Sequence, residues 1–249
     1  MKTWLDLKPI WLSALLMCTF PSQARATSII NGGFEAGFTG WTRADQLGSE
    51  GTFALQTGTT SPVTGTTVPA PPGGSRAAMT DAEGPGSHVL YQTFSVDALV
   101  SLATLNFDLF IGNRATAFFA PDTLDFATPT LNQQARVDII ASGADPFSLA
   151  PGDVLQNLFK TNPGDALVSG YTHLSLDVTS IFNSHFNGPL TLRFAETDNV
   201  FTFQMGVDNV VIQASPRQVI PGPSSWILTL TGLFAIFWFR GPARRPRLV

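Results

Sequence analysis

The chain has 249 residues, of which 44% are hydrophobic and 13% are charged, and its formal net charge is −4. The charge is uneven: residues 27–215 hold six basic and seventeen acidic residues, a net charge of −11, whereas the tail beyond them holds five arginines and no acid. Because so acidic a body repels phosphate backbones and anionic lipid surfaces, no nucleic-acid partner is expected.

The first 26 residues have the pattern of a secretory signal peptide. Two lysines precede an apolar run over 10–20, and Ala24 and Ala26 form an A-x-A cleavage site, which predicts a cut after Ala26. A buried N-terminal helix is the alternative. The only cysteine, Cys18, lies inside this segment. The mature chain therefore has no disulfide, and its stability outside the cell must come from a packed core, helped by a metal where one binds.

The mature body, 27–214, begins with "SIINGGFEAGFTGWT", in which two glycines permit a tight turn between Ile30 and Phe34, both expected in the core. The stretch 58–76 is rich in Thr, Pro and Gly. Such low complexity predicts a long, mobile surface loop.

Short apolar or alternating runs bounded by turn residues predict strands through the rest of the body. They lie at 53–57, 88–96, 104–111, 135–141, 172–178, 190–195, 201–205 and 207–213. The segment 151–161 is expected to carry one or two helical turns. Strands without a long amphipathic helix indicate an all-β fold, a two-sheet, jelly-roll-like sandwich formed by one domain.

The two ends of this body carry recognisable words, "NGGFEAGFTGW" and "MGVDNVVIQA". They resemble the galactose-binding-like jelly rolls of many carbohydrate-binding modules, which often start with N-G-x-F-E…G-W and end with a D-N-V strand. The resemblance implies that Glu35 and Asp208 bind a structural Ca²⁺ where the first and last strands meet, since Ca²⁺ prefers hard oxygen ligands. The alternative is that Asp208 caps a turn and Glu35 is a solvated acid.

Aromatic composition bears on sugar binding. The body holds sixteen phenylalanines but only Trp41, Tyr91 and Tyr171 of the amphipathic aromatic types that sugar clefts favour. This scarcity counts against a strong carbohydrate platform. A lectin-like module would have to use these three residues around a groove.

Enzyme signatures are sparse. In "GPGSH", Ser87 and His88 are adjacent on a strand and so face opposite ways, which prevents them from pairing as nucleophile and base. The acids Glu196 and Asp198 are interpreted as part of a polar turn, "AETDN". No enzyme activity is therefore expected. A polysaccharide hydrolase remains the rival hypothesis, and it would need two carboxylates about 5–10 Å apart across an open cleft.

The tail, 215–249, contains fourteen uncharged residues at 226–239, about 21 Å of helix, which is marginal for a bilayer core of about 30 Å. One short transmembrane helix is predicted here. An arginine-rich stub, 240–249, follows it and is expected to stay in the cytoplasm, because positive charge resists translocation. Its arginines are Arg240, Arg244, Arg245 and Arg247.

The order of the tail resembles the PEP-CTERM sorting signal of Gram-negative bacteria: a proline word at 219–225, a helix and an arginine cluster. Pro221, Gly222 and Pro223 stand where that family has Pro-Glu-Pro, so the central acid is missing. The resemblance implies processing by exosortase, a membrane protease, after transient anchoring in the inner membrane. It also implies an exported cell-surface or extracellular protein with a structural or adhesive role in exopolysaccharide or biofilm. A polysaccharide-binding module and a plain membrane anchor are the alternatives.

Overall fold

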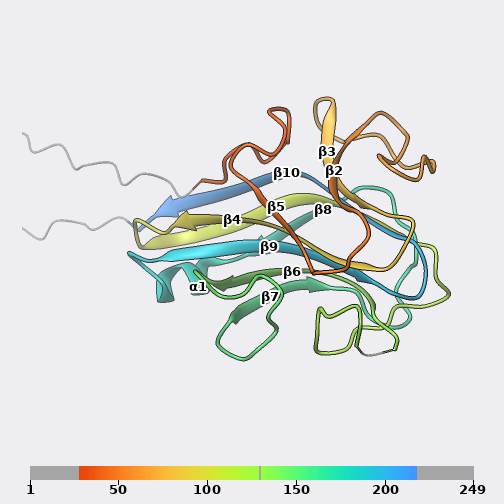
Figure 1. The fold of residues 1–249 in the computed structure, drawn as a ribbon. Helices are drawn as coiled ribbons and strands as arrows, with labels where there is room; N and C mark the ends of the chain where they lie inside the picture. The colour runs from red at the N-terminus through yellow and green to blue at the C-terminus, as the bar shows by residue number, and fades with distance from the viewer. Residues whose placement is uncertain (1–27, 129, 218–249) are drawn as a thin grey trace, which may run out of the picture.

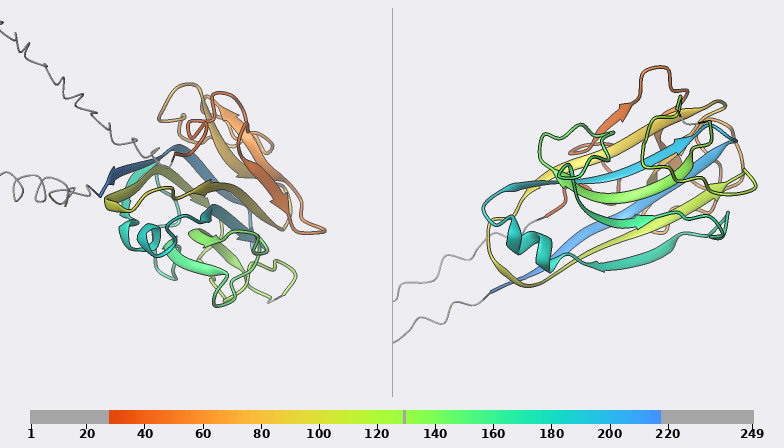
Figure 2. Two further views of the ribbon diagram at one scale, coloured as in Figure 1. Left: turned by 90° about the vertical axis from the view of Figure 1, so that its left-hand side faces the viewer. Right: turned by 90° about the horizontal axis from the view of Figure 1, so that it is seen from below.

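The computed structural model describes residues 28–128 and 130–217, which form two antiparallel five-stranded sheets packed face to face (Figures 1 and 2). One sheet has the order β1-β4-β9-β6-β7 and the other β2-β3-β10-β5-β8. The elements are β1 (Thr42–Asp45), β2 (Thr52–Thr57), β3 (Arg76–Asp81), β4 (Gly86–Ser95), β5 (Val100–Asn113), β6 (Gln133–Ala141), β7 (Val154–Lys160), β8 (Thr172–Asp177), α1 (Thr179–Ser184), β9 (Pro189–Asp198) and β10 (Phe203–Pro216). The predicted all-β sandwich is confirmed.

Two predictions of secondary structure are wrong. The expected helical turns at 151–161 are strand β7, because its residues pair with β6 along the edge of the sheet. The expected polar turn "AETDN" belongs to β9 as far as Asp198, since β9 is paired on both sides, with β4 and with β6. Pairing of this kind satisfies the backbone N–H and C=O groups of buried strands, and here it overrides the local turn preference of polar residues.

The core lies between the sheets and follows the period of two expected of strands. In β9, Leu190, Leu192 and Phe194 face this core, and the residues between them face outward. Phe34 is fully buried there as predicted, whereas Ile30 is 58% exposed, so its expected core position is wrong.

Loops cover the outer faces of both sheets. On one, Leu124 packs on Val89 and Ala195. On the other, the segment 58–76 runs across the sheet, and its Val68 is buried against Met79 and Phe110. Strands covered on both faces can bury charged side chains as well as apolar ones, and the candidate sites are built on such buried charges.

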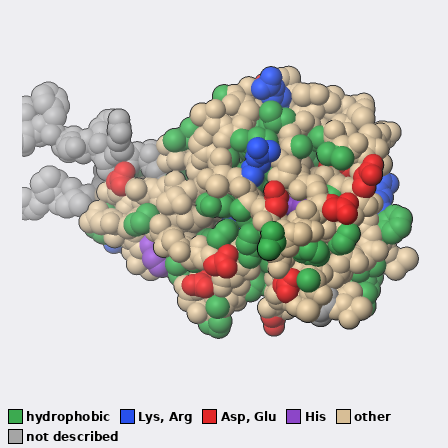
Figure 3. Space-filling model, viewed as in Figure 1, with side chains coloured by type: hydrophobic (Ala, Val, Ile, Leu, Met, Phe, Trp, Pro, Cys, Tyr) green, Lys and Arg blue, Asp and Glu red, His purple; other side chains and the backbone are tan. Residues whose placement is uncertain are grey.

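The face of the molecule seen in Figure 3 carries scattered acidic side chains and fewer basic ones, in keeping with the acidic body. Within the described ranges, no helix is long and apolar enough to cross a membrane. The signal peptide with Ala24 and Ala26, and the sorting tail with its proline word, helix and arginines, lie outside the described residues.

Candidate functional site

Three polar groups interrupt the apolar packing. The outer groove lies over β6 and β9 and is built on Arg136, Asp138 and Arg193. The end junction joins Glu35 and Asp208. The interior cluster consists of His88, Glu196 and Asp198, which lie between the sheets.

A buried charge network lies next to the outer groove and reaches its lining through Arg136. Asp138 accepts hydrogen bonds from Nε and Nη2 of Arg136 at 2.8 and 2.9 Å and from Nη2 of Arg193 at 2.5 Å. Burial alone would raise the pKa of Asp138, but the hydrogen bond from Arg136 and the charges of both guanidinium groups lower it overall. The carboxylate is thus fully ionised and held between two cations.

Buried side chains from the same sheet hold both walls of the groove. Arg193, fully buried, donates from Nη1 to the carbonyls of Pro146 and Ser148, each at 2.8 Å. Gln134 donates from Nε2 to the carbonyls of Pro121 and Thr123 at 3.2 and 2.9 Å. These bonds fix two loops that lack regular structure of their own, so the groove is preformed.

The groove encloses about 600 Å³. Its lining combines a carboxylate, a guanidinium, two hydroxyls and one aromatic ring, from Asp122, Arg136, Thr123, Ser148 and Phe147. Such a mixture can bind a neutral polar ligand through hydrogen bonds while one apolar face packs on the ring.

The end junction joins the first described segment to the last strand. The N–H of Val210 donates to the carbonyl of Gly32 at 2.9 Å, and a Cβ at Gly32 would lie 1.8 Å from the carbonyl oxygen of Val210. Only glycine allows this approach. The sequence words at the two ends therefore meet in space, as the resemblance implied.

Both predicted calcium ligands bracket residues 73–76. Oε1 of Glu35 accepts the N–H groups of Ser75 and Arg76 at 2.8 and 2.9 Å, and Oδ2 of Asp208 accepts that of Gly73 at 3.0 Å. The Ser75 bonds lower the pKa of Glu35, whereas burial raises that of Asp208 to about 6. These oxygens accept backbone donors in this structure, and calcium stays a prediction.

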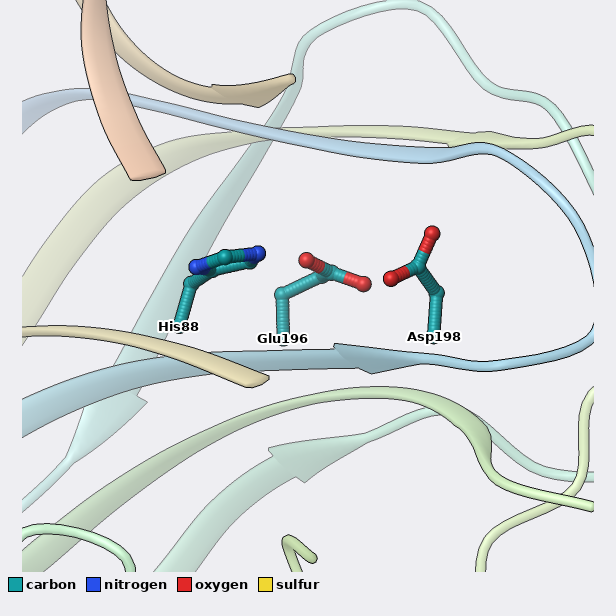
Figure 4. A group of neighbouring side chains, drawn as sticks. All are labelled: His88, Glu196 and Asp198. Carbon is teal, nitrogen blue, oxygen red and sulfur yellow. The ribbon is translucent and has the colours of Figure 1, made fainter. Parts of the chain in front are cut away.

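The interior cluster comes from neighbouring strands. His88 lies opposite Glu196 in the β4–β9 register, and Gly86 lies opposite Asp198. All three side chains are buried, and Figure 4 shows them side by side with Glu196 in the middle. Ser87, on the outer face, hydrogen-bonds Thr197 instead, so the expectation that Ser87 and His88 face opposite ways is met.

The candidate ligand aromatics lie apart. Trp41 is 7% exposed and packs on Phe34 and Phe194 in the core. Tyr91 packs against Leu124 and its neighbours on the outer face of the sheet that contains β4 and β9. Tyr171 packs on Phe110 on the outer face of the second sheet. The structure does not bring them together around one groove.

Sequence reasoning did not single out Arg136, Asp138 or Arg193, and it assigned His88 no role. A usable signal was present: "QARVDIIA" and "LTLRFAETD" place charges inside runs with the apolar content of buried strands. A buried charge requires a partner or an ion, and so marks a candidate site.

Fold and sites together define the chain as an all-β, two-sheet sandwich domain with ligand-sized hollows at its surface. No protein-family model matches the sequence, and no curated protein matches it.

Solved structures with a similar chain trace include an adhesin domain (K3) of Lys-gingipain from Porphyromonas gingivalis W83, with 15% identity over 74% of this chain and 96% of that one, TM-score 0.45. The carbohydrate-binding module TmCBM61, in complex with β-1,4-galactotriose, shows 11% identity over 74% of this chain and 96% of its own, TM-score 0.43. A cyclase from Fischerella sp. shows 17% identity over 80% and 100%, TM-score 0.45. At these identities and TM-scores the likeness does not establish a function for this chain.

Proposed function

We propose that this protein is an exported polysaccharide-binding module with a structural or adhesive role, and that the outer groove holds the sugar. The observation that carries this proposal is the preformed groove itself, whose walls are tied to a buried charge network. A groove ordered before binding avoids the entropic cost of fixing loops when a ligand arrives.

The lining suits a sugar with vicinal hydroxyls. Arg136 uses Nε and Nη2 for Asp138, and its Nη1 makes no hydrogen bond within the described part of the chain. That nitrogen is available to donate to a sugar hydroxyl, and Asp122 can accept from another. The half-buried ring of Phe147 offers an apolar surface to the C–H face of a pyranose.

The placement of Glu196 and Asp198, the two acids that the sequence singled out, does not favour the rival hydrolase hypothesis. Glu196 and Asp198 lie two residues apart on the same face of β9 and are 1% and 4% exposed. A glycosidase places its carboxylates on opposite sides of an open cleft. This pair instead has the placement of a group that holds an ion.

Affinity electrophoresis in gels containing neutral or uronic-acid polysaccharides tests the groove. Phe147→Ala should weaken retention about fivefold or more, since a stacked ring contributes about 1 kcal/mol or more. The control Phe186→Ala removes an exposed ring (42%) outside the groove and should leave retention unchanged. Equal loss in both variants, or no retention of the wild type by any polysaccharide, contradicts the proposal.

We also propose that the tail acts as a sorting signal for exosortase, on the strength of its proline word, apolar segment and closing arginines. Intact-mass analysis of protein recovered from the native cell surface tests this. A new C-terminus between Pro221 and Ser225 supports cleavage during export. A chain still ending at Val249 would instead mark a plain anchor.

A further inference from the structure

We propose that His88, Glu196 and Asp198 form a binding site for one divalent transition-metal ion, such as Zn²⁺, between the two sheets. This site is separate from the outer groove and from the end junction. It does not depend on the polysaccharide proposal.

Geometry places three ligand atoms together. One nitrogen of His88 and one carboxylate oxygen each from Glu196 and Asp198 lie within 4.8 Å of one another. Three ligands about 2.1 Å from one ion stand roughly 3.0–3.4 Å apart, so small rotamer adjustments suffice. The side chains lie in one row along the paired strands β4 and β9, which are rigid supports (Figure 4).

Hydrogen bonding leaves two acceptors facing each other. Nδ1 of His88 lies 2.8 Å from Oδ1 of Asp45, which fixes the proton on Nδ1 and leaves a lone pair on Nε2. Neither Nε2 of His88 nor Oε1 of Glu196 has a hydrogen-bond partner among the described residues, and both atoms are buried. Two buried acceptors side by side need a proton or a cation between them.

The charge balance favours a cation. No lysine or arginine in the described part of the chain forms an ion pair with Glu196 or Asp198. Two buried carboxylates without a counter-charge are costly, and a divalent ion would neutralise both. The Asp45–His88 bond is also the usual outer support of a metal-bound imidazole, which sets the tautomer and orients the ring.

The ligand types select the class of metal. An imidazole nitrogen with two carboxylate oxygens suits Zn²⁺ and its first-row neighbours, whereas Ca²⁺ and Mg²⁺ prefer oxygen alone. Access exists, because Asp198 also lines a pocket of about 310 Å³ formed with residues 199–202 and with Glu83. Water in that pocket can complete the coordination.

Glycine at position 86 makes room for the imidazole. A Cβ there would lie 2.4 Å from Nε2 of His88, the same atom that faces the carboxylates. The backbone N–H of Gly86 also donates to Oδ1 of Asp198 at 3.0 Å, which orients the third ligand.

Calorimetric titration of the chelator-treated chain, without a polyhistidine tag, tests the site with Zn²⁺ alone. We expect one ion per chain with a micromolar or lower Kd, unaffected by excess Mg²⁺ or Ca²⁺. Glu196→Gln, which nearly preserves shape, should weaken binding at least a hundredfold. His173→Gln removes an exposed histidine that also pairs with an aspartate, and it should bind as the wild type does. Glu35→Gln should also leave binding unchanged, which separates this site from the end junction.

A second measurement uses the wild-type chain and so does not depend on a variant folding. The sequence has three histidines. Substoichiometric Co²⁺ should broaden or shift the imidazole NMR signals of His88 and spare those of His173 and His185. Perturbation of the two other histidines instead of His88 overturns the proposal. Failure of the chain to bind Zn²⁺ also overturns it, and would mean that a proton shared between His88 and Glu196 satisfies the two acceptors. Loss of polysaccharide retention with Zn²⁺ binding intact would contradict the groove and leave this site standing.

Discussion

Strand β9 carries buried charged side chains on both of its faces, and these charges are paired differently on the two faces. On the outer face, Arg193 meets Asp138, which a second guanidinium also binds, so every charge has a partner from the chain. On the inner face, starting three residues along, Glu196 and Asp198 form no ion pair with a lysine or arginine of the described chain, and His88 is the basic side chain beside them. The outer group supplies its own counter-charge, whereas the inner group needs a proton or an ion from outside.

The two groups therefore have different roles. The outer network stabilises loops and shapes the groove, because its spare donors reach the carbonyls of Pro146 and Ser148. The inner group adds nothing comparable to the packing, and it leaves unpartnered atoms in the described core. A fold keeps such atoms at a functional site more readily than elsewhere.

The largest expected effect comes from breaking the outer network. Asp138→Ala leaves two buried guanidinium groups without their carboxylate and should lower the free energy of unfolding by about 3–5 kcal/mol. Urea unfolding measures it. Asp97→Ala, at an exposed position, should stay within about 0.5 kcal/mol. If the two variants unfold alike, the outer network does not stabilise the fold.

The pH dependence of the metal-free chain should separate the two groups. Burial, and then the charge of Asp198, raises the pKa of Glu196, and burial raises the pKa of Asp198 to about 7. Between an ordinary carboxyl pKa near 4 and these raised values, the folded chain holds protons that the unfolded chain has released. Stability should therefore fall as pH rises from about 4 to above 7, by on the order of 4 kcal/mol for Asp198.

Asp138 should act in the opposite direction. Its lowered pKa means that the unfolded chain takes up the proton first, so its contribution is present above pH about 4 and is lost on further acidification. Thermal unfolding with chelator, from pH 3 to 9, checks both limbs. The double variant Glu196→Gln, Asp198→Asn should flatten the limb between pH 4 and 7 and leave the acid limb. A wild-type curve without the first limb would contradict the unpaired state of the inner acids.

A smaller effect is expected from crowding the inner group. Gly86→Ala pushes a methyl group against the imidazole of His88 and should cost about 1–3 kcal/mol, as overpacking of a core does, together with Zn²⁺ affinity. Gly170→Ala is the matched control, because a Cβ there meets nothing within 4 Å. Equal melting temperatures for the two variants would show that the imidazole is not held where the structure places it.

The smallest effect is expected at the end junction. Glu35→Gln weakens the acceptor of the Ser75 and Arg76 N–H groups at an exposed position and should lower the melting temperature only slightly. Added Ca²⁺ should raise the melting temperature of the wild type and not of this variant, if the predicted clip exists. A melting temperature that neither chelator nor the variant moves would show that no calcium ion binds at the end junction.

The sequence by itself determined the fold class and the place where the first and last segments of the domain meet. Alternating runs such as "QARVDIIA" specify strands because the side-chain period of a strand is fixed, and the glycine-rich word around Gly32 marked where the first and last segments meet. The paired-sandwich class followed from the absence of any long amphipathic helix. The predictions of export and of a sorting tail also rest on local patterns, and these lie outside the described residues.

Only the tertiary structure decided which charges meet. His88 and Glu196 are over a hundred residues apart, and the β4–β9 register places them opposite each other. A shift by one residue would send Glu196 to the outer face, so no local pattern could identify the cluster. The same holds for Arg193 and the loop carbonyls that it fixes. Local preference sets the elements of this chain, whereas register and loop packing set its chemistry.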